Sequence, residues 1–302
     1  MNPYKIAIIG LGQIASSYHN ALESLNKYNL VAVCDLNPYA VSKEKYRDYP
    51  FYTNYMDMIK NHQIDIIIIS TPPITHTKIA LDVMSHQINV LLEKPGVLNL
   101  IELTQLLQSA NKNNVKIDTI FHWQHANEVL FIKKYYPNIK KATYIKTEIY
   151  DPYTINKKFI KKEKIPLHGA WFDSGVNALS MMSLFIDIND YTMDKKVNFI
   201  DPKSNLPYYA NRTYKQKNLY YSILVNWRYH KNYKRTRIKL DDKMIKIIHH
   251  LEEVYENNHL IYKSNERERL SSHYHNYFKD FKLESVSNHH FELIHRKLIE
   301  GI

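Results

Sequence analysis

The stretch that decides the fold of this chain is Tyr4-Lys5-Ile6-Ala7-Ile8-Ile9-Gly10-Leu11-Gly12-Gln13-Ile14-Ala15, near the amino end. Its first six residues have the apolar, β-branched character of a buried strand, and a glycine ends them. Residues 16–27 then show helical spacing. Further strand-like runs follow at residues 30–34, 64–70 and 89–92, with a helical run at residues 75–86. Strands alternating with helices predict right-handed βαβ units and a parallel sheet.

The turn between the first strand and the first helix has the spacing Gly10-x-Gly12-x-x-Ala15. In such a turn the first glycine permits a sharp bend and the second lets the backbone approach a pyrophosphate. The small third residue lets the helix pack closely on the strand. The pattern therefore predicts a dinucleotide site at the helix N-terminus, with Gln13 and Ile14 beside the phosphates.

Asp35 ends the second strand, twenty residues after Ala15. A carboxylate there accepts hydrogen bonds from ribose hydroxyls and repels a 2′-phosphate, which favours NAD over NADP. The alternative is an ordinary strand-end aspartate that caps a turn. Thr71, Pro72 and His76 follow the third strand, at the edge of the sheet where such folds bind ligands, or they merely begin a helix.

The regular alternation of predicted strands and helices ends after residue 121. Strand-like stretches lie at residues 142–150, 220–229, 237–240 and 244–249, and helix-like stretches lie at residues 178–186 and 272–282. This pattern predicts an α+β domain built on an open, mainly antiparallel sheet. We therefore expect two domains, residues 1–121 and 122–302, with residues 192–214 left unassigned between loops and short strands.

Composition excludes several classes of protein. The chain has 302 residues, 44% of them apolar, and no apolar run approaches the ~20 residues that span a bilayer. The start lacks a basic stretch followed by an apolar one, and Cys34 is the single cysteine, so we expect a cytoplasmic protein without disulfides or a metal site. The net charge of +11 would suit a nucleic-acid binder, but the basic residues are dispersed and form no recognised binding motif. We expect neither nucleic acid nor a membrane as partner.

The motif Glu93-Lys94-Pro95-Gly96 follows the fourth strand of the first domain. The proline holds Lys94 in extended conformations, at the edge of the sheet. A partly desolvated lysine near a positive nicotinamide ring should have a lowered pKa, as a general base near neutral pH requires. We expect Glu93 beside the cofactor. The alternative for Lys94 is a solvated surface lysine.

Three motifs together resemble the Gfo/Idh/MocA (glucose–fructose oxidoreductase/inositol dehydrogenase) family. They are Gly10-x-Gly12-x-x-Ala15, Thr71-Pro72-Pro73-x-x-His76 and Glu93-Lys94-Pro95. The resemblance implies an N-terminal Rossmann domain and a C-terminal α+β domain whose open sheet carries the substrate and often an oligomer interface. It implies bound NAD or NADP, a small-molecule sugar as substrate, and a dimer or tetramer assembled through that sheet.

A second motif, Phe172-Asp173-Ser174-Gly175-Val176-Asn177-Ala178-Leu179-Ser180, is similar to one branch of that family. Most members carry histidine where Asn177 stands, whereas aldose 1-dehydrogenases for D-galactose or L-arabinose carry asparagine. The resemblance implies that Lys94, Asp173 and Asn177 are catalytic and that the C1 hydroxyl of an aldose is oxidised to a lactone. Ser174 departs from the proline of that branch.

The same resemblance implies a substrate pocket formed by His122, Glu148, Tyr153 and Trp227. Three of them have a structural alternative: His122 as a satisfied structural histidine, Glu148 as a strand acid paired with a lysine, and Trp227 as a sheet-core aromatic. Two functional alternatives also remain open. One is oxidation or reduction of a polyol or another carbonyl compound in the same pocket. The other is a non-catalytic sensor that binds NAD(P), because a fold does not fix a function.

Overall fold

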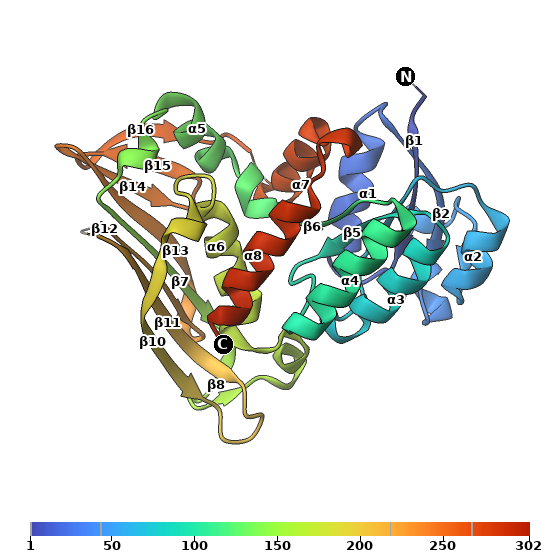
Figure 1. Ribbon diagram of the computed structural model, residues 1–302, viewed down its shortest axis with the longest axis horizontal. Helices are drawn as coiled ribbons and strands as arrows, with labels where there is room; N and C mark the ends of the chain where they lie inside the picture. The colour runs from blue at the N-terminus through green and yellow to red at the C-terminus, as the bar shows by residue number, and fades with distance from the viewer. Residues whose placement is uncertain (1, 43, 218, 267) are drawn as a thin grey trace. The chain divides into compact units, whose positions relative to one another are not determined.

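A computed structural model describes residues 2–42, 44–217, 219–266 and 268–302 of the chain. Two compact units are present, Met1–Ile120 with Leu270–His295, and Phe121–Arg269 with Arg296–Ile302 (Figure 1). The sequence placed everything after residue 121 in the second domain, but Leu270–His295 returns to the first unit. The physical reason is apolar burial, because Tyr274, Phe278 and Phe281 join the first unit's core.

The first unit is built on a six-stranded sheet of order β3-β2-β1-β4-β5-β6. Its strands are β1 (Tyr4–Ile9), β2 (Tyr28–Cys34), β3 (Phe51–Tyr52), β4 (Ile66–Ile69), β5 (Asn89–Glu93) and β6 (Ile117–Ile120). All neighbouring strands are parallel, as predicted. The strand order reverses beside β1, which creates the crevice where doubly wound folds bind dinucleotides.

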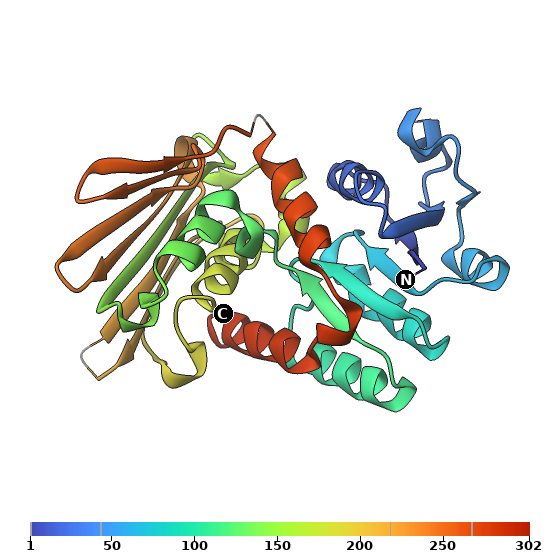
Figure 2. The same cartoon turned by 90° about the horizontal axis from the view of Figure 1, so that it is seen from above.

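Helices enclose this sheet, and both faces of its central strands are buried. The helices are α1 (Ala15–Glu23), α2 (Tyr55–Asn61), α3 (Pro73–Ser85), α4 (Leu100–Asn113), α7 (Arg269–Asp280) and α8 (Asn288–Glu300). Figure 2 shows α3 and α4 side by side. All four residues of β4 are fully buried, which explains why its sequence is an unbroken isoleucine run rather than an alternation.

The second unit is built on an eight-stranded sheet of order β10-β11-β12-β7-β13-β14-β15-β16. Its strands are β7 (Tyr144–Pro152), β10 (Thr192–Ile200), β11 (Pro207–Gln216), β12 (Leu219–Asn226), β13 (Arg228–Leu240), β14 (Lys243–Ile248), β15 (Glu253–Glu256) and β16 (His259–Lys263). Neighbours are antiparallel except β12 and β7, so the mainly antiparallel sheet is confirmed. The unassigned residues 192–214 form most of β10 and β11.

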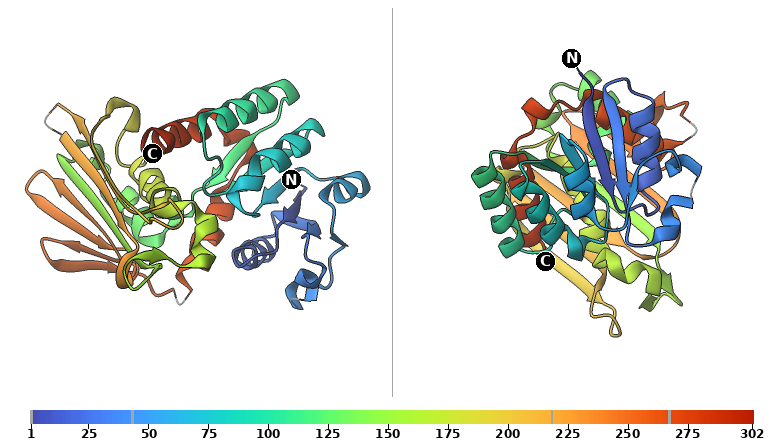
Figure 3. Two further views of the ribbon diagram at one scale, coloured as in Figure 1. Left: turned by 90° about the horizontal axis from the view of Figure 1, so that it is seen from below. Right: turned by 90° about the vertical axis from the view of Figure 1, so that its right-hand side faces the viewer.

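Helices α5 (Asn127–Tyr135) and α6 (Val176–Met182) cover one face of this sheet, here called the covered face (Figures 1 and 3). On β7 the side chains of Ile145, Thr147 and Ile149 point to the covered face and are almost fully buried. Tyr144 and Lys146 alternate with them and point to the other face, here called the open face. In the described part of the chain, no helix combines the length and apolar character needed to cross a membrane.

Candidate functional site

Two glycines of the turn after β1 are required for different reasons. Gly10 has a φ of +94°, and a Cβ added there would lie 2.8 Å from the backbone of Ser70 and Thr71. A Cβ added to Gly12 would meet no heavy atom of the described residues within 4 Å. No packing contact in that part of the chain therefore demands glycine at this second position. The open space fits a pyrophosphate brought close to the backbone.

The N-terminus of α1 beside this turn carries no side-chain cap from any described residue. Its first N–H groups are therefore available to an anion, and the helix dipole favours a negative charge there. Gln13 and Ile14 lie on the turn that leads into the helix, where the sequence placed them beside the phosphates.

A cavity of about 260 Å³ opens at the carboxyl ends of β1, β2 and β4. It is lined by Gly10, Gly12, Asp35, Thr71 and Pro72, together with residues that the sequence did not single out, such as Tyr55 and Cys34. The structure thus brings five of the expected cofactor residues together at the crevice edge, where a dinucleotide would bind.

Two backbone N–H groups fix the Asp35 carboxylate. Leu11 N donates to Oδ2 at 2.6 Å and Asn37 N donates to Oδ1 at 2.8 Å. Each carboxylate oxygen keeps further acceptor capacity, so Asp35 can still accept bonds from ribose hydroxyls. The cavity and its carboxylate therefore fit NAD.

His76 does not line this cavity. It is fully buried, with Nδ1 3.1 Å from the Pro95 carbonyl oxygen and Nε2 2.8 Å from that of Thr71. Burial lowers the pKa of its imidazole, although the carbonyl contacts act in the opposite direction. His76 therefore fastens the turn after β4 to the turn after β5.

Glu93 is likewise an internal anchor. Its carboxylate accepts hydrogen bonds from the hydroxyls of Tyr18 on α1 and Tyr274 on α7, the latter at 3.3 Å. Burial raises the pKa of Glu93, and the charge of Lys94 and the tyrosine hydrogen bonds oppose that rise. The sequence predicted Glu93 beside the cofactor and did not predict a contact of Glu93 with either tyrosine. The two tyrosines come from distant parts of the chain.

The backbone after Lys94 is held on both sides of Pro95. The Lys94–Pro95 peptide bond is cis. Gly96 N donates to Nε2 of His295 at 3.0 Å, and His295 Nδ1 lies 2.7 Å from the Phe291 carbonyl oxygen. Burial lowers the pKa of His295 to about 4, so the ring is neutral and can accept at Nε2. Lys94 itself is half-buried, on a rigid turn.

In the second unit, Asp173 and Asn177 lie at the junction of a π-helical turn, Trp171–Gly175, and α6. Asn177 Nδ2 donates to the Asp173 carbonyl oxygen at 3.2 Å. Its Oδ1 is buried and has no hydrogen-bond partner among the residues that the structure describes. An unmet buried acceptor is costly, so this atom is a candidate to receive a hydrogen bond from a ligand hydroxyl.

Ser174 is the centre of a polar cluster in the same turn. Its hydroxyl lies 3.2 Å from Oδ2 of Asp151 and 3.2 Å from Oδ2 of Asp173, and the Trp227 indole N–H donates to it at 3.4 Å. The resemblance marked Ser174 only as a departure from proline. Here the hydroxyl links two carboxylates and an indole, which a proline could not do.

The sequence missed Asp151 and its partner Lys234. Lys234 Nζ lies 3.4 Å from Oδ1 of Asp151, which is almost fully buried. The signal was present in the alternation along β7, which turns Asp151 to the same face as Thr147 and Ile149. The ion pair offsets the charge of one of the two carboxylates that Ser174 joins.

Tyr153 and Trp227 join this cluster. Their ring centroids are 5.3 Å apart in an edge-to-face arrangement, and Tyr153 N donates to the Trp227 carbonyl oxygen at 3.0 Å. Burial raises the pKa of Tyr153, and the charges of Asp151 and Asp173 raise it further. The structure thus brings Tyr153, Trp227, Asp173 and Asn177 into one region of the second unit.

Glu148 does not belong to that region. It points to the open face of the sheet, where Arg235 Nε donates to its carboxylate at 2.6 Å and Lys146 and Arg237 lie at 3.3 Å. These cations lower its pKa although burial acts to raise it. Glu148 and Asp151 lie on opposite faces of the sheet, because successive side chains of a strand point to alternate faces and these two residues are three apart.

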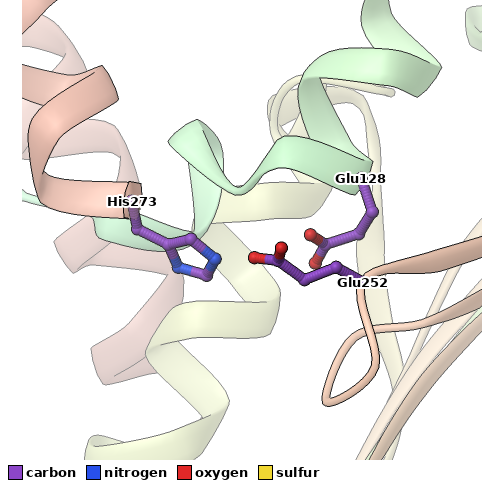
Figure 4. Close-up of side chains that lie close together, drawn as sticks. All are labelled: Glu128, Glu252 and His273. Carbon is purple, nitrogen blue, oxygen red and sulfur yellow. The ribbon is translucent and has the colours of Figure 1, made fainter. Parts of the chain in front are cut away.

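His122 and His249 occupy interior positions. His122 begins a short 3₁₀ turn after β6 and is buried. His249 lies 2.7 Å from Glu128 Oε1 and 2.8 Å from the Thr236 hydroxyl, within a buried polar network. Figure 4 shows the Glu128 carboxylate of α5 next to that of Glu252. This network fastens α5 to the covered face of the sheet.

Comparison with known proteins agrees with the first unit's architecture. Residues 4–121 match the family described as "Oxidoreductase family, NAD-binding Rossmann fold", named GFO_IDH_MocA. The chain is 34% identical to oxidoreductase P35 of Formosa agariphila over 114 residues, 37% of this chain and 35% of that one. It is 27% identical to glucose-6-phosphate 3-dehydrogenase of Bacillus subtilis over 162 residues, 53% of this chain and 43% of that one. These matches thus span less than half the length of the curated relatives.

Solved structures extend the likeness of fold to the whole chain. A UDP-N-acetylglucosamine 3-dehydrogenase from Acidithiobacillus ferrooxidans superposes with a TM-score of 0.80 at 14% identity, covering 99% of this chain and 97% of that one. An oxidoreductase from Agrobacterium radiobacter, solved with NAD+, L-tartaric acid and magnesium, gives 0.79 at 12% identity, covering 98% and 94%. Identities this low establish the fold alone.

Proposed function

We propose that this protein is a NAD-dependent sugar dehydrogenase, because residues 4–121 match the family of oxidoreductases with an NAD-binding Rossmann fold, GFO_IDH_MocA. Its substrate is an aldose resembling galactose or arabinose, and its product is the lactone formed by oxidation at C1. The observation that carries the proposal is the buried, unpartnered Oδ1 of Asn177 beside Asp173. That pair stands in the motif that resembles aldose 1-dehydrogenases.

Different residues of the chain bind the cofactor and accept the proton. NAD, when bound, supplies the hydride acceptor for C1. Gly10, Gly12 and the N-terminus of α1 hold its pyrophosphate, and Asp35 holds the ribose hydroxyls. Lys94 accepts the proton of the C1 hydroxyl.

Asp173 and Asn177 orient that hydroxyl, and an asparagine cannot titrate. The transferred proton therefore rests on Lys94 alone. The partly exposed ring of Tyr153, backed by the fully buried Trp227, lies beside Asp173 and is of the kind that packs against the apolar face of a sugar ring.

The proposal is tested by measuring NAD and NADP reduction with a panel of aldoses, polyols and sugar acids. We expect saturable turnover with at least one aldose, with NAD preferred, and a lactone as the first product by NMR. Turnover restricted to polyols would replace the aldose assignment with the polyol alternative. Tight NAD binding without turnover of any compound would indicate a sensor rather than an enzyme.

We further propose that the protein forms a dimer or tetramer through the open face of the second unit's sheet. That face carries aromatic and charged side chains together, including Tyr150, Tyr233 and the cluster of Glu148 with Arg235. Static light scattering should give a mass of two or four chains. Arg235→Glu, which places a repelling charge beside Glu148, should shift the mass toward the monomer, whereas a monomeric wild-type protein would exclude this assembly.

A further inference from the structure

A lysine-rich hairpin lies next to the Tyr153 region of the second unit. Residues 157–164 contain five lysines and one glutamate, far above the average density of positive charge in the chain. Strands β8 (Thr154–Ile155) and β9 (Phe159–Ile160) form the hairpin. Residues 156–158 connect the two strands. Asn156 and Lys157, both with φ near +50°, are the central residues of a turn closed by the hydrogen bond from Lys158 N to the Ile155 carbonyl oxygen.

Hydrogen bonds fasten this segment to the candidate site. Lys161 N donates to the Tyr153 carbonyl oxygen at 3.0 Å, and Ile160 N donates to the buried carboxylate of Asp201, also at 3.0 Å. Arg228, which follows Trp227, donates from Nε to the Lys157 carbonyl oxygen. The lysines are therefore carried on an ordered scaffold that is joined to the strands bearing Tyr153 and Trp227.

Aromatic rings hold several of these ammonium groups without neutralising them. Lys164 Nζ lies 4.4 Å from the centre of the Tyr153 ring. Lys203 Nζ and Lys158 Nζ lie 4.2 Å and 5.4 Å from the centre of the Phe159 ring. A cation–π contact orients a cation but leaves its full charge.

The contrast with other lysines of the same unit is informative. Lys146, Lys243 and Lys263 each lie within 3.3 Å of a glutamate. Within the described ranges of the chain, none of the five lysines of residues 157–164 forms an ion pair, and neither does Lys203. Ammonium groups that outnumber the nearby carboxylates, here Glu163 and Asp201, leave a local excess of positive charge that favours the binding of an anion.

We propose that this cluster, Lys158, Lys161, Lys164 and Lys203 with Arg228, is a subsite for an anionic group on the substrate. The proposal rests on the proposed function and narrows it: the aldose carries a phosphate, phosphodiester or carboxylate at a carbon away from C1. Lys164 is the central member, since its ammonium lies on the ring that adjoins Trp227 and the Asp173 cluster.

Calorimetry with NAD-saturated protein tests the subsite, using D-galactose, D-galactose 6-phosphate, D-galacturonate and UDP-D-galactose as probes. We expect at least one anionic sugar to bind tenfold or more tightly than D-galactose, with an affinity that falls as salt rises. The double variant Lys161→Gln/Lys164→Gln should raise the Kd of the anionic sugar about tenfold and change the Kd of D-galactose less than about twofold. The reason is that hydrogen bonds between charged groups contribute more free energy than hydrogen bonds between neutral groups. The anionic probe that binds most tightly shows whether the subsite recognises a phosphate, a carboxylate or the diphosphate of a nucleotide sugar.

The matched control is Lys140→Gln/Lys141→Gln, which removes two exposed lysines of the same unit from the short 3₁₀ turn Ile139–Lys141, outside the sheet. Equal affinity for neutral and anionic sugars, or equal losses in both double variants, would overturn the subsite. Turnover of neutral aldoses alone would overturn it while sparing the proposed function. An anionic sugar that binds through Lys164 without NAD reduction would retain the subsite and reject the dehydrogenase.

Discussion

Replacing Lys94 by alanine should lower kcat by about 10²–10⁴-fold with the best aldose of the panel, since a positioned general base typically contributes that factor. The substitution removes the group assigned to accept the proton of the substrate hydroxyl, a role that Asn177 cannot take over because an amide does not titrate. The fold should survive, since Glu93, Pro95 and Gly96 remain held by Tyr18, His76 and His295. Steady-state kinetics with NAD reduction measures the loss.

Two further measurements separate a lost base from a damaged site. NAD affinity, followed by fluorescence titration, should change less than threefold, and added methylamine should restore part of kcat by acting as a diffusible base. The matched control is Lys78→Ala, an exposed lysine of α3 in the same unit, which should behave as wild type. Turnover of Lys94→Ala within threefold of wild type would remove Lys94 from the mechanism.

Replacing Trp171 by alanine should lower the free energy of unfolding of the second unit by about 3–5 kcal/mol, the range for a large buried aromatic. Trp171 is 1% exposed, and its indole N–H donates to the Leu298 carbonyl oxygen at 2.7 Å. Gly175 and Gly301 approach its ring so closely that a Cβ on either would clash with it. The variant therefore leaves a large cavity and a carbonyl without its donor.

Urea denaturation followed by circular dichroism measures this change. Phe199→Ala is the control, because Phe199 is 49% exposed on β10 and its truncation should cost less than about 1 kcal/mol. A loss below about 1 kcal/mol for Trp171→Ala would mean that the turn bearing Asp173 does not depend on this ring.

The cofactor half of the candidate site was readable from the sequence because its signals are local. A glycine pair, a strand-end carboxylate and a run of isoleucines each report on the residues beside them. Gly10, Gly12, Asp35 and Thr71 indeed line one cavity. His76 and Glu93 were also singled out, but as cofactor residues. Their contacts with Pro95, Tyr18 and Tyr274 depend on chain segments that local patterns cannot bring together.

Less of the substrate half of the candidate site could be predicted from the sequence. The motif around Asp173 could be found by resemblance, but the strand residues that accompany it could not. Successive side chains of a strand point to opposite faces of the sheet, so a shift of one residue places a side chain on the wrong face. That is why Glu148 lies among cations on the open face while Asp151 meets Ser174. Likewise, no pattern in residues 157–164 reveals that the ammonium groups of Lys164 and Lys158 lie near the rings of Tyr153 and Phe159.

A parallel sheet covered on both faces and a dinucleotide turn could be predicted from the sequence, because strand burial and glycine geometry are properties of short segments. The motifs that contain Lys94, Asp173 and Asn177 could also be found there. The packing of α7 in the first core and the contacts of Ser174 with two carboxylates became visible in the three-dimensional fold. The fold also shows that a basic hairpin is hydrogen-bonded to the backbone of Tyr153. Those contacts link residues far apart in sequence, and burial and hydrogen bonding across the fold select them.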